Sequence, residues 1–409
     1  MSATESGYQL RPTLFGQYCL LERISVGGMA EVFRARPFHA PDADKYLALK
    51  RILPHLAEDE DCLKMFEDEA KLGVHLRHPN VVRVFELGRF QSSPYILMEF
   101  ISGQDLLALQ KRLRREGLIM SVAQACYIVK ELAKGLDYAH KAVDDKGQPL
   151  HVIHRDVSPQ NIFIAYHGAV KLIDFGVAKA SVQSTKTRVG VLKGKFGYMS
   201  PEQIRGEQID HRSDIFACGT VLWELLTNRR LFTGESELEV FHKVKEARVE
   251  RPSQKNVEVP DCVDEIVMKA LSPQPPSRYQ TCGELVRDLQ AFLSSTCPLY
   301  TQAHLLQWMR RFFGEELEEV ELKVERFRQI RTPEDVRRAV FSGAGVSDPS
   351  ADGAAEGATR IWDAEIEPEQ DQDLDAFIAQ HTVVQAGGFD LEEFTTFVDA
   401  GVPSLEEVL

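Results

Sequence analysis

Three polar side chains near the middle of the chain have the types and spacing that phosphoryl transfer requires. Asp156 ends a His-Arg-Asp triplet, Asn161 follows shortly after it, and Asp174 begins an Asp-Phe-Gly triplet. Phosphoryl transfer needs a carboxylate that orients the attacking hydroxyl and oxygen ligands that hold Mg²⁺ on the phosphates. We expect Asp156 to do the first and Asn161 with Asp174 to do the second.

The elements that must position these side chains come as strands first and helices later. Alternating apolar and polar residues predict strands within 15–36, at 46–52, 81–88 and 95–101, with one helix at 58–76. The helical pattern then covers 105–115, 121–140, 213–227, 235–246, 261–271, 282–293 and 299–330. This order indicates an α+β protein, or two lobes, rather than alternating βαβ units.

The ordered set of motifs resembles that of the protein-kinase family over about residues 15–296. The segments at 27–29 and 198–203 are similar to bacterial Ser/Thr kinases in particular. The resemblance implies a bilobal fold, with a small β-rich N-lobe at 15–100 and a larger helical C-lobe at 101–296. It also implies transfer of the γ-phosphate of ATP to serine or threonine hydroxyls of protein substrates, with Mg²⁺ as the metal and Mn²⁺ as an alternative.

The resemblance assigns roles to further residues. Lys50 matches the strand lysine that contacts the phosphates, and Glu69 matches the helix glutamate that holds this lysine, whereas Glu67 fits less well by spacing. Asn161 and Asp174 would hold the metal ion. The residues placed around ATP are Ile24, Gly27, Gly28, Val32, Ala48, Lys50, the gatekeeper Met98, the hinge residues Glu99 and Ile101, and Asp174.

Other matches concern support and regulation. Asp214 resembles the aspartate that braces the catalytic loop, and Arg278 resembles the arginine that pairs with Glu202 of the Ser-Pro-Glu segment. Arg155, directly before Asp156, is typical of kinases that a phosphate on the activation loop switches on. By position, the favoured acceptors of such an autophosphorylation are Thr185 and Thr187.

The sequence departs from the family pattern at three places. The glycine-rich loop at 25–32 keeps only its middle glycine in register, Ser158 replaces a lysine two residues after Asp156, and Lys195 replaces a threonine. The last two residue types are exchanged relative to the pattern. We therefore include Lys195 among the catalytic candidates, on the hypothesis that it reaches into the cleft as the missing cation. The alternative is an exposed charge on a loop.

Two other functions compete with Ser/Thr kinase activity. The altered glycine loop and Ser158 favour a pseudokinase scaffold that binds ATP without efficient catalysis, whereas the retained Lys50 and Asp156 oppose it. Tyrosine specificity is a weaker rival, because the segment 158–160 lacks the arginine that tyrosine kinases carry there.

Charge is distributed unevenly along the chain. The formal net charge is −14, which argues against general nucleic-acid binding. Residues 341–409 alone carry −15, from 16 acidic residues and the single basic Arg360, so residues 1–340 are near neutral. We expect an N-terminal arm at 1–14, a helical extension at 297–340 and a mostly disordered acidic tail at 341–409. A short apolar face in this tail could dock a partner, and it consists of Leu391, Phe394, Phe397 and Val398.

The cysteines and the apolar runs concern the compartment. The seven cysteines are scattered and form no Cys-x-x-Cys pair, which predicts reduced thiols rather than disulfides or a zinc site. The longest apolar run, around 215–226, is too short and too polar to span a bilayer. We therefore expect a cytoplasmic protein without membrane insertion.

Overall fold

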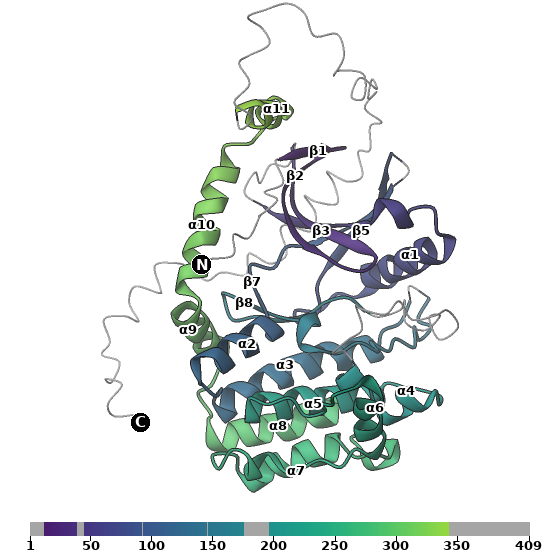
Figure 1. Cartoon of the computed structure of the whole chain (residues 1–409), viewed down its shortest axis with the longest axis vertical. Coiled ribbons are helices and arrows are strands. Elements are labelled where there is room, and N and C mark those ends of the chain that lie inside the picture. The colour runs from purple at the N-terminus through teal and green to yellow at the C-terminus, as the bar shows by residue number, and fades with distance from the viewer. Residues whose placement is uncertain (1–11, 39–44, 92, 145, 176–195, 343–409) are drawn as a thin grey trace, which may run out of the picture. The chain divides into compact units, whose positions relative to one another are not determined.

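The structure is a computed structural model, and it describes residues 12–38, 45–91, 93–144, 146–175 and 196–342. All of these residues belong to the first of the two units into which the chain divides, Met1–Ala344. Within this unit a strand-rich N-lobe is followed by a helical C-lobe, as Figure 1 shows. The expected order of strands first and helices later is confirmed.

The N-lobe is a six-stranded antiparallel sheet with one large helix. The strands have the order β1-β2-β3-β4-β6-β5, and the helix α1 (Glu60–His75) packs on β5. The strands are β1 (Thr13–Phe15), β2 (Tyr18–Val26), β3 (Ala30–Pro37), β4 (Leu47–Ile52), β5 (Val84–Phe90) and β6 (Ser93–Glu99). β2 and β3 form a hairpin whose turn contains Gly27 and Gly28, as the sequence predicts.

Both faces of this sheet are buried. Along β6, Leu97 belongs to the apolar cluster on one face, whereas its neighbours Ile96 and Met98 belong to the cluster on the other face. Successive side chains of a strand point to opposite faces, so a strand covered on both sides reads as a continuous apolar run. The second cluster also contains Phe66 and Ala70 of α1, and it therefore holds this helix against the sheet.

The C-lobe is built around two long buried helices, α3 (Val122–His140) and α5 (Arg212–Thr227). A three-stranded sheet, β7-β8-β9, lies next to α3; β8 directly follows Asn161 and β9 ends two residues before Asp174. Its strands are β7 (Gly103–Asp105), β8 (Ile162–Ala165) and β9 (Val170–Leu172). The other helices are α2 (Leu106–Glu116), α4 (Pro201–Arg205), α6 (Glu237–Glu246), α7 (Asp261–Ala270) and α8 (Cys282–Thr296).

Three helices follow the C-lobe, namely α9 (Gln302–Phe312), α10 (Gly314–Arg328) and α11 (Pro333–Ser342). The apolar period of 299–330 predicts the first two, and its expected role as core is confirmed because Leu305 and Met309 are fully buried in the C-lobe cluster. Figure 1 shows α9 beside α2, α10 rising along the molecule, and α11 near β1.

None of the seven cysteines forms a disulfide in the part of the chain that the structure describes. Among the helices that the structure describes, none combines the length and the apolar character that crossing a membrane requires. Residues 1–11 and 341–409 were expected to form most of an arm and a tail; apart from the backbone of 341 and 342, these residues lie outside the part described.

Candidate active site

The side chain of Lys50 joins two acidic residues from different parts of the chain. Its ammonium lies 2.6 Å from Glu69 Oε1 and 2.8 Å from Asp174 Oδ1. Lys50 stands in the middle of β4 and pairs with Val32 and Ile96 on the neighbouring strands. The sequence-predicted pairing of Lys50 with Glu69 is therefore present in the structure.

Helix α1 selects Glu69 rather than Glu67 for this contact. Asp59 caps the start of α1 by accepting a hydrogen bond from Cys62 N at 3.0 Å. Glu67 lies two residues before Glu69, on another face of the helix, where it pairs with Arg89 at 3.3 Å. The packing of α1 on the sheet thus turns only Glu69 toward the lysine.

These three charges shift one another's protonation. Burial alone would lower the pKa of Lys50, but the carboxylates of Asp174 and Glu69 outweigh it and raise this pKa. Burial raises the pKa of Glu69, and the nearby Asp174 adds to this effect against the opposing pull of Lys50. Lys50 therefore carries a firm positive charge next to the cleft, which suits an anionic ligand.

Asp156 and Asn161 are hydrogen-bonded to each other within the loop 154–161, the predicted catalytic loop. The Asn161 amide nitrogen donates to the backbone oxygen of Asp156 at 2.8 Å and to its Oδ2 at 3.0 Å. The short 3₁₀ turn Pro159–Asn161 places the amide at this point. Both bonds use the nitrogen of Asn161, so its amide oxygen is not engaged in them.

Asp214 supports this loop through hydrogen bonds with its backbone. It is fully buried at the start of α5 and accepts hydrogen bonds from the backbone nitrogens of His154 and Arg155 at 2.8 and 2.9 Å. His140, at the end of α3, also contacts it at 2.8 Å. Burial alone would raise the pKa of Asp214, but these partners outweigh burial and lower it. Asp214 therefore stays charged and fixes the backbone before Asp156.

His154 supports the same loop from the inside. Its Nδ1 lies 3.3 Å from the backbone nitrogen of Asp156, and its Nε2 lies 3.1 Å from the carbonyl oxygen of Ile173. A neutral ring with its proton on Nε2 satisfies both contacts, and burial lowers the pKa of His154 toward this form. The ring also packs on Phe175, with centroids 4.7 Å apart. The two motifs are thus joined through one neutral imidazole.

The backbone is strained at two of the site residues. Arg155 and Asp174 adopt left-handed conformations, with φ of 64° and 54°. Such conformations cost non-glycine residues of the order of 1 kcal/mol or more, and they cluster at functional sites. In the sequence, Arg155 lies before Asn161 and Asp174 lies after it.

Three of the residues expected around ATP lie together in the N-lobe. Ala48 and Met98 are opposite each other on β4 and β6 and are buried in the same cluster, with Val32 packed against it. The backbone nitrogen of Glu99 donates to Arg83 O at 2.9 Å and is therefore already engaged within the N-lobe. Ile24 on β2 is an exposed apolar side chain, 45% accessible.

A small cavity lies behind the gatekeeper position. It measures about 20 Å³ and is lined by residues that include Glu69, Met98, Asp174 and Phe175. This volume has room for about one water molecule. Met98 thus separates the region predicted for adenine from a nearly filled space next to α1.

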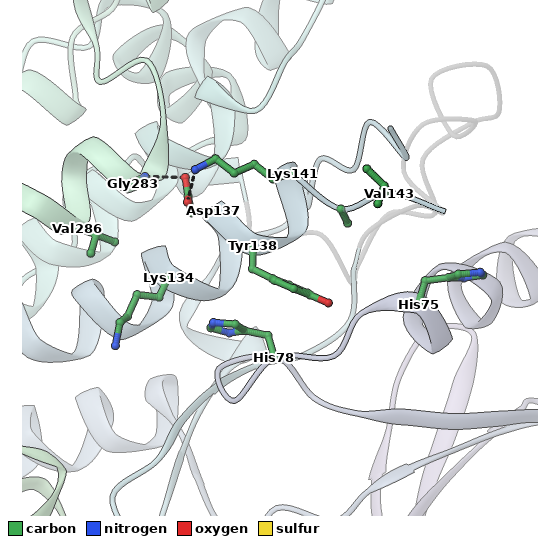
Figure 2. Close-up of a pocket in the computed structure, with 10 residues that line it drawn as sticks. His75, His78, Lys134, Asp137, Tyr138, Lys141, Val143, Gly283 and Val286 are labelled. Atoms are coloured by element: carbon green, nitrogen blue, oxygen red, sulfur yellow. Dashed lines mark hydrogen bonds and ion pairs between the residues drawn. The ribbon is translucent and has the colours of Figure 1, made fainter. Parts of the chain in front are cut away.

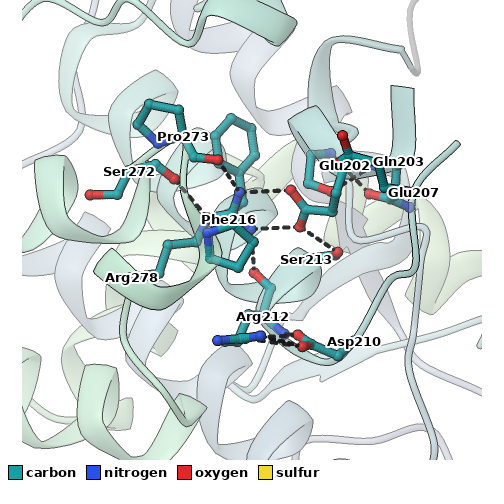
Figure 3. A network of polar contacts seen from close by, with 12 residues as sticks. Glu202, Gln203, Glu207, Asp210, Arg212, Ser213, Phe216, Ser272, Pro273 and Arg278 are labelled. Atoms are coloured by element: carbon teal, nitrogen blue, oxygen red, sulfur yellow. Dashed lines mark hydrogen bonds and ion pairs between the residues drawn. The ribbon is translucent and has the colours of Figure 1, made fainter. Parts of the chain in front are cut away.

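A second polar network holds the end of the predicted activation segment (Figure 3). The guanidinium of Arg278 makes two parallel bonds to Glu202, at 2.7 and 2.8 Å, and its Nε donates to Ser272 O at 2.7 Å. Ser213 donates to the same carboxylate at 2.7 Å. Burial alone would raise the pKa of Glu202, but Arg278 and Ser213 outweigh burial and lower it. The predicted pairing of Arg278 with Glu202 is present and buried.

A further cavity, of about 520 Å³, lies between the end of α1 and the C-lobe (Figure 2). In its wall the His78 ring stacks on Tyr138 with centroids 5.0 Å apart, and the Tyr138 hydroxyl accepts a hydrogen bond from Arg77 N at 3.0 Å. Lys141 on the same wall pairs with Asp137 at 2.6 Å. These contacts tie the loop after α1 to α3.

Three candidates lie outside the described residues, namely Thr185, Thr187 and Lys195. Ser158, which replaces the expected lysine, is buried, and its hydroxyl has no hydrogen-bond partner among the residues that the structure describes.

Sequence reasoning missed two supporting residues. His140 contacts Asp214 from the end of α3, and the Gln203 side chain donates to the backbone oxygen of Arg155 at 3.2 Å. His140 belongs to no spaced motif, so no local signal marks it. Gln203 ends the segment 198–203 that resembles bacterial kinases, but that resemblance does not indicate its contact with Arg155.

Comparisons with known proteins agree with this geometry. Residues 18–289 match the family model described as the protein kinase domain. Tyrosine-protein kinase MasK of Myxococcus xanthus is 37% identical over 318 residues, which cover 77% of this chain and 49% of the relative. Serine/threonine-protein kinase PknB of Mycobacterium leprae is 36% identical over 284 residues, covering 68% of this chain and 43% of the relative.

The alignment with MasK is longer than the segment matched by the family model, so its similarity extends beyond that segment. The chain spans less than half the length of either relative. Among solved structures, the Mycobacterium tuberculosis PknI kinase domain has a TM-score of 0.50 at 22% identity, over 71% of this chain and 99% of that one, which shows the fold alone. The predicted bilobal α+β kinase fold is confirmed, and this chain belongs to the protein kinase family.

Proposed function

We propose that the chain is a serine/threonine protein kinase that transfers the γ-phosphate of ATP to hydroxyl groups of other proteins. The observation that carries the proposal is the joining of Lys50 to both Glu69 and Asp174, at 2.6 and 2.8 Å. A single cation is thereby held between the element that positions it and the loop that carries a predicted metal ligand. Phosphoryl transfer depends mainly on such positioning and on charge stabilisation.

The donor set fits ATP with Mg²⁺. Asn161 and Asp174 offer amide and carboxylate oxygens, the ligand types that Mg²⁺ prefers, and Mn²⁺ accepts the same ligands. When bound, the metal neutralises charge on the phosphates. Lys50 binds the α- and β-phosphates, the strand and hinge residues from Ile24 to Ile101 surround the base and ribose, and the turn at 27–28 covers the phosphates.

Asp156 orients the attacking hydroxyl and takes up its proton. Asn161 holds the Asp156 carboxylate at 3.0 Å, which limits the side chain to few orientations. Asp214 and His154 fix the backbone beneath it. A correctly placed base of this kind is worth about 10²- to 10⁴-fold in rate.

The hydroxyl that accepts the phosphate is open to direct test. Relatives with 32–36% identity carry serine/threonine-kinase names, whereas MasK is named a tyrosine-protein kinase. The segment 158–160, Ser-Pro-Gln, lacks an arginine and supports serine and threonine. Incubation of the full chain with labelled ATP, Mg²⁺ and a protein substrate, followed by acid hydrolysis, should release labelled phosphoserine or phosphothreonine. Labelled phosphotyrosine alone would favour the second function, a tyrosine kinase.

Regulation by autophosphorylation forms part of the proposal. Arg155 precedes Asp156 and can pair with a phosphate, which carries about two negative charges. Mass spectrometry of the chain after incubation with ATP should locate phosphate on Thr185 or Thr187. An active chain without phosphate between residues 180 and 190 would contradict this activation scheme.

We also propose that Lys195 supplies the cation that Ser158 lacks. The buried, unpartnered hydroxyl of Ser158 supports the idea that position 158 no longer serves the phosphate. Lys195→Ala should then lower turnover more than ATP binding, and the double change Ser158→Lys with Lys195→Thr should recover much of the activity. Near-normal turnover of Lys195→Ala would contradict the exchange.

Two finer points rest on composition. The scattered cysteines, which form no disulfide among the described residues, support a reducing, cytoplasmic location. The acidic segment 341–409 is proposed as a tether or partner-docking segment through Leu391, Phe394, Phe397 and Val398. Truncation at Phe341 should leave peptide phosphorylation nearly unchanged, and a large loss would show instead that this segment acts on the cleft.

A further inference from the structure

The helices after the C-lobe connect the two lobes by a second route, separate from the hinge. The hinge is the segment 99–102, from the last residue of β6 to the residue before β7. We call residues 299–342 the strap. Figure 1 shows that the strap runs from α9, beside α2, to α11, near β1. Its two ends therefore contact different lobes.

The lower end of the strap is anchored in the C-lobe. Leu305, Met309 and Phe313 are buried in the C-lobe cluster. Arg112 of α2 forms an ion pair with Glu316, and its guanidinium also lies 4.9 Å from the Phe313 ring centre. This end is thus part of the lobe's own core.

The upper end of the strap is anchored on the N-lobe sheet. Val336 of α11 is 2% exposed and forms a separate apolar cluster with Cys19 and Leu21 of β2. Lys323 of α10 pairs with Glu22 at 3.4 Å. In addition, Tyr46 donates to the backbone oxygen of Val324 in α10 at 3.3 Å. The strap therefore covers the side chains of Cys19 and Leu21, which are both buried.

Arg34 of β3 lies where the strap, the sheet and the hinge meet. Its guanidinium carbon lies 4.4 Å from the ring centre of Phe100 in the hinge and 5.6 Å from that of Phe327 in α10. The Tyr46 ring is 5.7 Å away. The side chain is buried and pairs with Glu22 at 3.1 Å. One cation therefore contacts three segments that are distant in sequence.

Arg34 is buried with few hydrogen bonds, so its contacts with aromatic rings are important for its stability. Its Nε and Nη1 have no hydrogen-bond partner among the described residues, although both atoms are buried. Burial lowers the pKa of Arg34, against the opposing charge of Glu22. A guanidinium with few hydrogen bonds depends on aromatic faces for compensation, and such contacts are strongest where water is excluded. Removal of one ring should therefore weaken the contacts of Arg34 with the other rings.

We propose that the strap fixes the hinge through Arg34, and that Arg34 is a positioning residue for nucleotide binding, acting through Phe100 on the backbone of Glu99 and Ile101. The proposal rests on the proposed function, because the hinge is assigned there to adenine. Arg34 itself has no contact with the cleft residues Lys50 or Asp156 among the interactions that the described residues make.

The test uses the full chain and two readouts. Phe327→Ala removes the strap's ring, and because Phe327 is only half-buried the variant should fold. Arg34→Lys keeps the charge next to Glu22 but loses the planar group that stacks on rings. Both should raise the dissociation constant of ADP, measured by calorimetry, about fivefold, the size of one cation–π contact. Both should also speed hydrogen exchange in the peptide 96–103.

Leu322→Ala is the matched control, since Leu322 lies on the same helix and is 64% exposed. It should change neither readout. In turnover assays the two test variants should raise KM for ATP and leave kcat nearly unchanged. Unchanged exchange at 96–103 in both test variants would overturn the proposal, as would equally faster exchange throughout the N-lobe, which would indicate a merely structural role. The exchange readout requires no nucleotide, so it decides on the strap even if the unmodified chain fails to bind ADP and the proposed function falls.

Discussion

The Lys50 ammonium lies 2.6 Å from Glu69 Oε1. Lys50 belongs to β4 and Glu69 to α1, and the residues 53–59 connect these two elements. The contact exists only when α1 lies against the sheet with the correct face inward. It therefore reports the position of α1, and with it the geometry of the cleft. An apolar cluster that includes Phe66 and Ala70 holds the helix in that position.

Glu69→Gln should therefore reduce activity without unfolding the protein. The change removes a charge-assisted contact worth about 1.5–3 kcal/mol, so kcat/KM should fall by about 10- to 100-fold. Steady-state phosphorylation of a peptide substrate measures it. Glu67→Gln is the matched control on the same helix, because Glu67 pairs with Arg89 and Lys71 at the surface, and it should stay within about twofold. Equal losses in both variants would show that the helix charge, not the pair, matters.

The buried pair of Glu202 and Arg278 should matter for stability. Glu202→Gln leaves the Arg278 guanidinium, whose side chain is fully buried, without its charged partner. Breaking such a pair costs about 3–5 kcal/mol, which urea unfolding can measure. Glu239→Gln removes an exposed pair with Lys243, and its effect on stability should be much smaller than that of Glu202→Gln. A loss below 1 kcal/mol in Glu202→Gln would mean that the network is not a stability element.

The same pair predicts how stability depends on pH. The pKa of Glu202 is lowered in the folded state from its ordinary value of 4.5, so the unfolded chain binds more protons as the pH falls below that value. The stability that Glu202 contributes is thus present above about pH 4.5 and is lost below it. Unfolding free energies of the unmodified chain and of Glu202→Gln should converge as the pH falls from 5 to 3. A constant difference over this range would contradict the lowered pKa.

The site could be predicted from sequence where chemistry dictates residue type at fixed spacing. Lys50, Asp156, Asn161 and Asp174 belong to such motifs, and the structure places Lys50 beside Asp174 and Asn161 beside Asp156. His140 could not be found in this way. It acts by packing against Asp214 from another helix, and contacts of that kind depend on tertiary structure rather than on local spacing.

Tight contact between the strap and the turn after β8 gives a further prediction. Gly168 has φ of +82°, and a Cβ there would lie 2.4 Å from Gln302 O in α9. Gly168→Ala should therefore destabilise the chain by about 1–3 kcal/mol, measured by urea unfolding. Gly314→Ala is the control within the strap, because a Cβ at Gly314 meets no atom within 4 Å, and it should be neutral or slightly stabilising. Equal stability of the two variants would argue against close packing of α9 on this turn.

The strap also contains a contact that could not be predicted from the sequence. The period of Leu305, Met309 and their neighbours predicts a buried helix, and the helix is present. The docking of α11 on β2 was not predicted, because one buried side chain, Val336, and two apolar residues of β2 make the cluster. Helix α11 has only ten residues, which is shorter than the window of about 11 residues over which an apolar period can be recognised.

Asp156→Asn tests the central claim most directly. The change keeps the shape of the side chain but removes the carboxylate that takes the proton from the attacking hydroxyl. Transfer of labelled phosphate from ATP to a protein substrate should fall by at least about 100-fold, while ATP binding measured by calorimetry should stay within about twofold. If the unmodified chain transfers no phosphate, or if Asp156→Asn transfers it at the same rate, the chain is not the kinase proposed here.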